Sequence, residues 1–174
     1  MIKTLLITTL LYINNTINTT KIKIEETLSA VKERVNISVD IDSLNKIPKK
    51  EKLNKLLPMF KYTAKKYNVP IKILVTTWII ETGYGSSNIF RLGYNFGGIK
   101  GYGKVKKIGR YRKYLNLFDG CLGLGSLLAS KRYYCKNCNE IEWFDKLKSK
   151  GYWESKTAYS KRLKILQQEN VRNL

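Results

Sequence analysis

Glu81 is the residue of this sequence best suited to acid catalysis. It ends an apolar segment, follows Trp78 by three positions, and precedes Gly83 and Gly85. A carboxyl group at the edge of an apolar wall is partly desolvated, which raises its pKa and keeps it protonated near neutral pH. Such a group can donate a proton to the leaving oxygen of a glycosidic bond. The alternative is a solvated glutamate near a helix C-terminus, although the helix dipole disfavours an anion there.

The segment that follows Glu81 has the composition of a ligand-binding region. Residues 82–118 contain no Asp or Glu, and seven of the chain's twelve glycines lie between Gly83 and Gly103. Glycines let a ligand approach the backbone, and aromatic rings with polar edges suit sugars as well as bases. A Gly-rich connector with core tyrosines would not explain their concentration beside Glu81. The basic residues include Lys100, Lys104, Lys106, Lys107, Arg110, Arg112 and Lys113, and the interleaved aromatic residues include Tyr84, Tyr94, Phe96, Tyr102, Tyr111 and Tyr114.

The overall charge indicates an anionic partner. The chain has 174 residues, with 33 Lys plus Arg and 13 Asp plus Glu, for a net charge of +20. This charge favours nucleic acid, anionic lipid or acidic wall polymers, although a lysine-rich solvated surface explains it equally well. The absence of His excludes Ser–His–Asp triads and any imidazole base. No apolar run reaches the roughly 18 residues that span a bilayer, so we expect no stable membrane span.

Three cysteines raise the question of a zinc or redox site. Cys135 and Cys138 have the spacing of half a zinc ribbon or of a redox pair, and Cys121 is the third. Zinc would need a fourth ligand, and neither a His nor a second Cys pair supplies it. We therefore expect unligated thiols and no metal or cofactor. A Cys135–Cys138 disulfide is the alternative if the protein is exported.

The sequence divides into an N-terminal arm, residues 1–50, and a second domain, residues 51–174. Residues 1–13 carry one Lys and a short apolar stretch, which resembles a weak secretion signal without an A-x-A cleavage site. A buried first strand or helix is the competing interpretation. The rest of the arm is polar and charged, and we find no catalytic motif in it.

Periodicity predicts the mainly α (α+β) class, with one small hairpin. We expect one helix to begin at Pro58 and end at Asn68, because proline suits a first turn and asparagine a left-handed cap. The next helix opens at Pro70 and carries one apolar stripe to Glu81. The other expected elements are a Gly-rich loop over 88–103, a basic hairpin over 104–114 around Gly109, a helix over 120–134 capped by Asp119, and helices over 141–148 and 157–168.

Four short motifs occur in order between residues 57 and 168. Residues 67–87 form an apolar segment that closes on Glu81-Thr-Gly-Tyr-Gly-Ser-Ser, and Asn95-Phe-Gly-Gly-Ile-Lys-Gly follows it. Tyr111-Arg-Lys-Tyr comes next, and Gly151-Tyr152 with Tyr159 comes last. In this order they resemble E-S-G-W-G-x-S, N-L-F-G-I-K-G, F-R-x-Y and G-Y-A-x-x-x-x-Y of the bacterial and phage glucosaminidases, which cut peptidoglycan.

The resemblance implies a lysozyme-like helical domain with a small β-hairpin lobe over residues 51–174. It also implies that Glu81 is the general acid and that Tyr152 assists it near the scissile sugar. We expect substrate to be bound by Trp78, Tyr84, Asn95, Phe96, Gly97, Lys100 and Tyr114.

Two departures from the family pattern leave the second catalytic group open. Family members often place a second acid in the β lobe, whereas this chain has none between Glu81 and Asp119. Glu154 stands where a small or hydroxyl residue is usual. Asp119 and Glu154 are the candidate second carboxylates, and a two-carboxylate mechanism needs them about 5–9.5 Å from Glu81. Otherwise the 2-acetamido group of the substrate or a water held by Tyr152 completes the reaction.

We therefore predict a peptidoglycan hydrolase, specifically an endo-β-N-acetylglucosaminidase that needs no cofactor. Its partners would be glycan strands and anionic wall polymers, and we expect a monomer unless it is part of a virion. The expected location is secreted, in the cell envelope or in a phage virion. The alternatives are a lytic transglycosylase or muramidase of the same superfamily, a basic nucleic-acid-binding protein, and a wall-binding protein without turnover. A Glu81 that is ion-paired in the interior and faces no cleft would contradict all of the catalytic interpretations.

Overall fold

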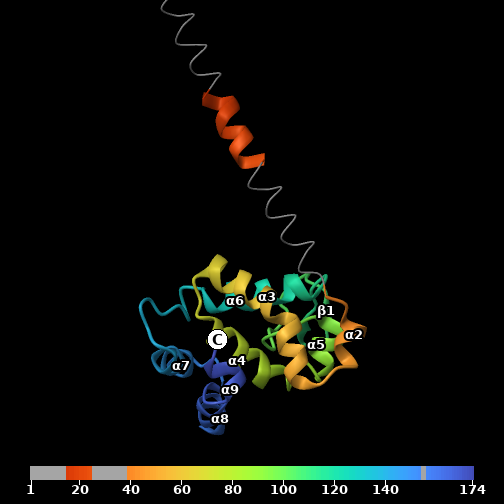
Figure 1. Ribbon diagram of the computed structural model, residues 1–174, viewed down its shortest axis with the longest axis vertical. Helices are drawn as coiled ribbons and strands as arrows, with labels where there is room; N and C mark the ends of the chain where they lie inside the picture. Colours follow the sequence, from red (N-terminus) through yellow and green to blue (C-terminus); the bar gives the residue numbers. More distant parts are fainter. Residues whose placement is uncertain (1–14, 25–38, 154–155) are drawn as a thin grey trace, which may run out of the picture. The chain divides into compact units, whose positions relative to one another are not determined.

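The computed structural model describes residues 15–24, 39–153 and 156–174 (Figure 1). The chain divides into two compact units, Met1–Ser38 and Val39–Leu174. In the first unit, residues 15–24 form a helix whose side chains are exposed. The signal-like segment 1–13 lies outside the described residues. None of the described helices combines the length and the apolar content that crossing a membrane requires.

The second unit begins with two helices in residues that we placed partly in the N-terminal arm. α2 spans Ile41–Asn45 and buries its only leucine. α3 spans Lys49–Tyr67, so the predicted start at Pro58 is wrong, and this proline lies inside the helix. The helix extends toward the N-terminus because Leu53 and Leu56 continue the apolar face of the later turns, and both are buried.

α4, Ile71–Thr82, lies at the centre of this unit and carries Glu81 in its last turn. Its ends are where the sequence predicts, because Asn68 before it and Gly83 after it adopt left-handed conformations with φ of 51° and 58°. Its apolar surface is wider than the predicted stripe, since every side chain from 73 to 79 is buried. The aromatic rings that pack on Trp78 belong to Phe60, Tyr84, Phe90 and Phe96.

The predicted loop over 88–103 contains a short helix that the sequence analysis missed. α5 spans Asn88–Gly93, and the hydroxyl of Ser87 caps it by accepting the backbone N–H of Phe90. A serine in this position is a good N-cap, but the surrounding glycines obscured it. The helix ends at Tyr94, which adopts a left-handed conformation with φ 51°.

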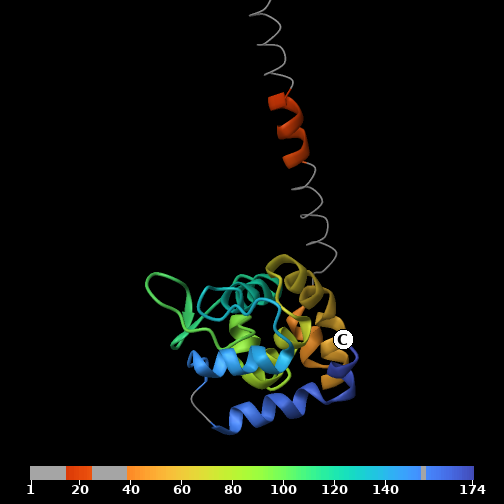
Figure 2. The same cartoon turned by 90° about the vertical axis from the view of Figure 1, so that its left-hand side faces the viewer.

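A small antiparallel hairpin follows and confirms the predicted β element. β1, Lys107–Ile108, pairs with β2, Tyr111–Arg112, and the turn between them contains Gly109 with φ 56°. In Figure 2 the hairpin region is the green loop that extends beside the helices. Lys100 forms an isolated bridge with Tyr111, so the Gly-rich segment is joined to the hairpin.

The rest of the chain is helical, which confirms the mainly helical class with one small hairpin. α6 spans Leu117–Leu128 and is capped by Asn116, not by Asp119, whose backbone N–H donates to the Asn116 side chain at 2.8 Å. The helix also ends earlier than the predicted residue 134. The two later predicted helices are present as α7 (Glu140–Ser149) and α8 (Lys156–Leu166), with ends within two residues of the predicted ones. A short terminal helix, α9 (Glu169–Arg172), was not predicted.

The cysteines are in a different state from the one we expected. Cys135 and Cys138 form a disulfide in the connection between α6 and α7, so the favoured interpretation of unligated thiols is wrong for this pair. Cys121 is a free thiol, buried in α6, and burial raises its pKa to about 12. Among the described residues, no three His, Cys, Asp or Glu side chains gather in a group that would hold a metal ion.

Candidate active site

Glu81 faces a cavity of about 480 Å³ between the Gly-rich loop and the helical part of the unit. Its side chain is 27% exposed, since the last turn of α4 carries it out of the apolar core to the wall of this cavity. The loop side of the cavity is formed by Gly97, Gly98, Ile99, Lys100 and Tyr102, and the opposite side by Leu127, Ser130, Arg132, Tyr133, Gly151 and Tyr152.

The two carboxylate oxygens of Glu81 have different surroundings. Oε1 accepts a hydrogen bond of 2.7 Å from Nη2 of Arg162. Oε2 lies against Gly98, where a methyl group would be only 3.1 Å away, and the φ of +61° at this glycine also disfavours a side chain. Gly98 therefore leaves room beside Oε2, at a point where the loop lines the cavity.

Arg162 is the site residue that the sequence analysis missed. It lies on α8, its side chain is fully buried, and its guanidinium is 3.9 Å from the ring centroid of Trp153. Nη1 also donates to the backbone oxygen of Ala158, one turn earlier. Helix periodicity could have indicated this residue. Arg162 is four residues after Ala158 and three before Ile165, and this spacing places a cation on the half-buried face of α8.

Burial and the neighbouring Arg162 have opposite effects on the pKa of the Glu81 carboxyl. Burial raises its pKa above 4.5, and the charge and hydrogen bond of Arg162 oppose that rise without cancelling it. Burial likewise lowers the pKa of Arg162, which the charge of Glu81 partly restores. For both groups, the effect of burial on the pKa is larger than the opposing effect of the partner's charge. Perturbed pKa values of this kind are common at functional sites. Glu81 is thus ion-paired, but it also faces a cavity. An ion-paired Glu81 that faced no cleft would have contradicted a catalytic role, and this is not what the structure shows.

Tyr152 is brought to the same cavity as Glu81 by the segment that follows α7. Its hydroxyl donates to the backbone oxygen of Gly97 at 3.3 Å, and its ring packs edge-on against Tyr133 with centroids 5.4 Å apart. Burial, reinforced by the negative charge of Glu81, raises the pKa of Tyr152. The phenol therefore stays neutral at ordinary pH and can serve as a fixed donor or orient a water molecule.

Three residues that we expected to bind substrate lie beneath the cavity instead. Trp78, Asn95 and Phe96 are fully buried, so their side chains offer no surface to a ligand, and we revise their role to support of the site. Asn95 shows how: its amide nitrogen donates to the backbone oxygens of Ile99 and Arg112 at 2.9 and 2.8 Å. Its amide oxygen accepts from the N–H of Ile99 at 2.9 Å. Asn95 therefore joins the Gly-rich loop to the hairpin.

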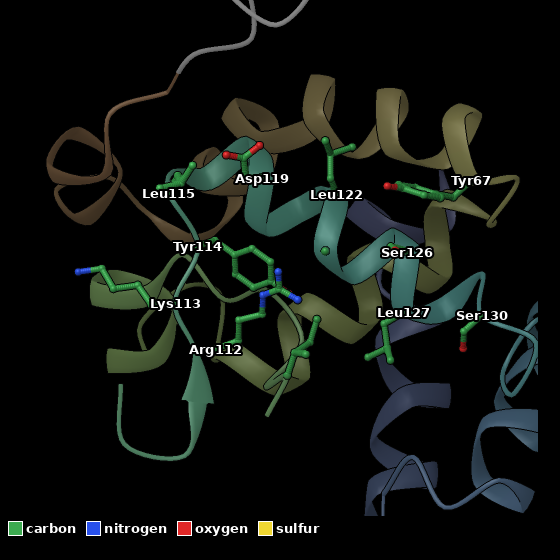
Figure 3. Close-up of a pocket in the computed structure, with 12 residues that line it drawn as sticks. Tyr67, Arg112, Lys113, Tyr114, Leu115, Asp119, Leu122, Ser126, Leu127 and Ser130 are labelled. Carbon is green, nitrogen blue, oxygen red and sulfur yellow. The ribbon is translucent and has the colours of Figure 1, made fainter. Parts of the chain in front are cut away.

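A second cavity, of about 610 Å³, extends the first one along the molecule (Figure 3). The two share Ile99, Leu127 and Ser130 as lining residues, so they lie next to each other. In Figure 3, Tyr114 points into the second cavity above Arg112, whose guanidinium lies 5.1 Å from the centroid of the Tyr114 ring. We call the two cavities together the active-site groove.

The other predicted residues are distributed unevenly over the groove. Gly97 and Lys100 line the first cavity, beside Glu81, whereas Tyr114 and Asp119 line the second. Tyr84 lines a different cavity of about 330 Å³ and donates to Oε1 of Gln168 at 2.6 Å. The structure therefore separates Tyr84 from the groove residues. Glu154, the other candidate carboxylate, lies outside the described residues.

The site thus consists of a partly desolvated carboxyl at the wall of a cavity, which is a suitable position for a group that donates a proton to a ligand. The family model of the glucosaminidases, described as mannosyl-glycoprotein endo-beta-N-acetylglucosaminidase, matches residues 57–171, and the chain belongs to this family. The family indicates a glycosidase that acts on peptidoglycan or similar glycans. No curated protein and no solved structure matches the chain.

Proposed function

We propose that this protein is an endo-β-N-acetylglucosaminidase that hydrolyses the glycan strands of peptidoglycan, with Glu81 as the general acid. The observation that carries the proposal is the position of the Glu81 carboxyl. One of its oxygens is held by Arg162, and the other lies beside Gly98 at the wall of a cavity of about 480 Å³, next to a second cavity of about 610 Å³. Burial raises the pKa of this carboxyl, which favours the protonated form that a general acid needs.

In the proposed reaction Glu81 gives its proton to the bridging oxygen as the bond from that oxygen to the anomeric carbon breaks. The positive charge that develops on the sugar is compensated by the 2-acetamido oxygen of the same residue, or directly by a water. Tyr152 is well placed to orient that water, because its neutral hydroxyl lies in the same cavity. Water finally supplies the hydroxyl at the anomeric carbon, and its proton returns to Glu81.

The charge of the groove supports an anionic glycan as the substrate. Lys100 and Arg132 line the first cavity, and Arg112 and Lys113 line the second. The carboxylates in these walls are Glu81, which is paired with Arg162, and Asp119. An excess of cations attracts a polymer that carries carboxylate or phosphate groups, such as the peptide-bearing strands and acidic polymers of a bacterial wall. We accordingly propose a location in or outside the cell envelope, including a phage virion.

The product of wall digestion tests the proposed bond specificity. We expect the wild-type protein to release soluble fragments from purified peptidoglycan, with N-acetylglucosamine at their reducing ends when they are reduced and analysed by mass spectrometry. Muramic acid at the reducing ends would establish a muramidase, and anhydro ends a lytic transglycosylase. Wall binding without release would leave a structural wall protein. Salt-sensitive DNA binding without release would instead favour a nucleic-acid-binding function.

A second experiment tests whether another carboxylate takes part. We expect Asp119→Asn and Glu154→Gln to keep near-normal turnover on peptidoglycan. Asp119 lines the second cavity rather than the cavity of Glu81, and its carboxylate accepts from the amide of Asn116 at 3.0 Å. The measurement is the initial rate of fragment release for each variant beside wild type. A large loss for a variant that unfolds at the wild-type denaturant concentration would restore the two-carboxylate mechanism.

A further inference from the structure

Arg162 is buried too deeply and is placed too close to Glu81 to be an incidental ion-pair partner. We propose that Arg162 is a positioning residue, which holds Oε1 of Glu81 so that Oε2 is the oxygen that carries and donates the catalytic proton. This inference rests on the proposed function of Glu81 as the general acid, and it assigns a part in catalysis to α8, which follows the other groove elements in the chain.

The two carboxylate oxygens of Glu81 are not equivalent. Nη2 of Arg162 lies 2.7 Å from Oε1, a length typical of a charge-assisted hydrogen bond, so this oxygen is unsuited to carry a proton. Oε2 faces Gly98, which itself lines the cavity. A proton on Glu81 therefore belongs on Oε2, on the side where the substrate would lie.

Arg162 is itself held in place by its neighbours. Its side chain is fully buried, it lies 3.9 Å from the centroid of the Trp153 ring, and Nη1 donates to the oxygen of Ala158. A group fixed in this way can define the direction of the Glu81 carboxyl, which sits at a helix end and would otherwise rotate. A general acid works only when its proton points at the leaving oxygen, and a misplacement of 1 Å can cost about 100-fold in rate.

A purely structural role explains the ion pair of Arg162 and Glu81 poorly. Replacing a buried ion pair by apolar groups is often neutral or stabilising. The Nε of Arg162 also has no hydrogen-bond partner within the described part of the chain. A core arginine retained only for stability would be expected to have its donors satisfied. The position of this cation is explained when its purpose is to act on the Glu81 carboxyl.

The pair also gives the inference a measurable consequence. The titratable and charged groups that contact Glu81 or line its cavity, among the described residues, are Arg162, Tyr152, Lys100, Tyr102, Arg132 and Tyr133. Of these, Arg162 lowers the pKa of Glu81. A general acid must be protonated to act, so turnover falls as the pH rises through the pKa of Glu81. Loss of the guanidinium removes the lowering influence, so that this fall should move to higher pH.

The test compares the pH profiles of kcat for wild type, Arg162→Met and Arg162→Lys on soluble peptidoglycan fragments. Methionine keeps much of the side-chain volume without the charge. Lysine keeps the charge but lacks the planar guanidinium with its fixed N–H donors. We expect Arg162→Met to lose about 10–100-fold in kcat at its optimum, with KM changed much less, and to show the alkaline fall at higher pH. In Arg162→Lys, the pH at which kcat falls on the alkaline side should lie closer to that of wild type. Lys161→Met, at the exposed neighbouring position on α8, is the matched control and should leave the profile unchanged.

The outcomes separate this inference from the proposed function. If wild type hydrolyses peptidoglycan and Glu81→Gln does not, the proposed function stands. Two results would then overturn the positioning role alone. One is an Arg162→Met variant with the wild-type pH profile of kcat, and the other is an equal loss of kcat in both Arg162 variants with no shift of the alkaline fall. If Arg162→Met fails to fold, carbon-13 NMR titration of Glu81 in wild type, Arg162→Lys and Arg162→Gln decides. A higher pKa of Glu81 in Arg162→Gln than in the other two supports the inference, and equal values in all three overturn it.

Discussion

Glu81→Gln should reduce the rate of peptidoglycan hydrolysis by about 100- to 10,000-fold, the usual contribution of a general acid. Glutamine has nearly the same shape and can still accept the hydrogen bond of Arg162, but it holds no acidic proton for the leaving oxygen. Binding to the wall should be retained, because the cations of the groove are unchanged. The measurements are fragment release and wall co-sedimentation with the same preparation.

Glu51→Gln is a suitable control for this variant. It removes the same charge from an exposed glutamate in the first turn of α3. We expect it to keep the wild-type rate. Hydrolysis by Glu81→Gln at more than a tenth of the wild-type rate would show that the proton comes from another group, and the proposed mechanism would have to be abandoned.

The same substitution has a stability effect whose sign depends on Arg162. A desolvated catalytic carboxyl considered alone predicts a small or favourable effect, because glutamine removes the cost of burying a charge. The ion pair changes that expectation, since Arg162 is fully buried and would retain only a neutral acceptor. The Arg162 guanidinium stays charged and keeps a hydrogen bond to the amide oxygen, but this buried cation loses its countercharge, which is destabilising. We therefore expect urea titration to show the free energy of unfolding of Glu81→Gln lowered by about 1 kcal/mol.

The part of the site that could be predicted from sequence is the part encoded locally. Glu81 was identified because helix periodicity and the glycine that ends α4 place it at the edge of an apolar surface. Asn68 and the hairpin turn at Gly109 were predicted for the same reason, since left-handed backbone limits the choice of residue. The mainly helical class follows from these same short-range patterns.

The part that could not be predicted depends on which elements meet in space. Arg162 is 81 positions from Glu81 along the chain, and only the packing of α8 on α4 brings the two together. Trp78, Asn95 and Phe96 carry the residue types of a sugar site, yet all three are buried, because composition does not reveal which rings face the groove. The start of α3 was misplaced because proline is a good first residue of a helix but is also tolerated within one.

Gly120→Ala should strongly destabilise the second unit, because α6 packs directly on the backbone that supports the active-site loop. A methyl group at Gly120 would overlap the backbone oxygen of Tyr94 and would also press on the ring of Phe96. Neither neighbour can move easily, since Tyr94 is in a left-handed conformation with φ 51° and Phe96 is fully buried. Relief of the overlap therefore requires α6 or the loop to shift as a whole.

Two opposing contributions decide whether Gly120→Ala raises or lowers the free energy of unfolding. In an exposed helix, replacing glycine by alanine raises stability by about 1 kcal/mol. Overpacking a tight contact costs about 1–3 kcal/mol and more when backbone must move. We expect overpacking to dominate, so that urea titration shows a free energy of unfolding lowered by at least about 2 kcal/mol. Hydrolysis should also be reduced, because the displaced loop carries Gly98, which lies against Glu81. Ser126→Ala, at an exposed position of the same helix, should change stability by less than about 0.5 kcal/mol. A Gly120→Ala variant more stable than wild type would show that α6 does not pack against this loop as described.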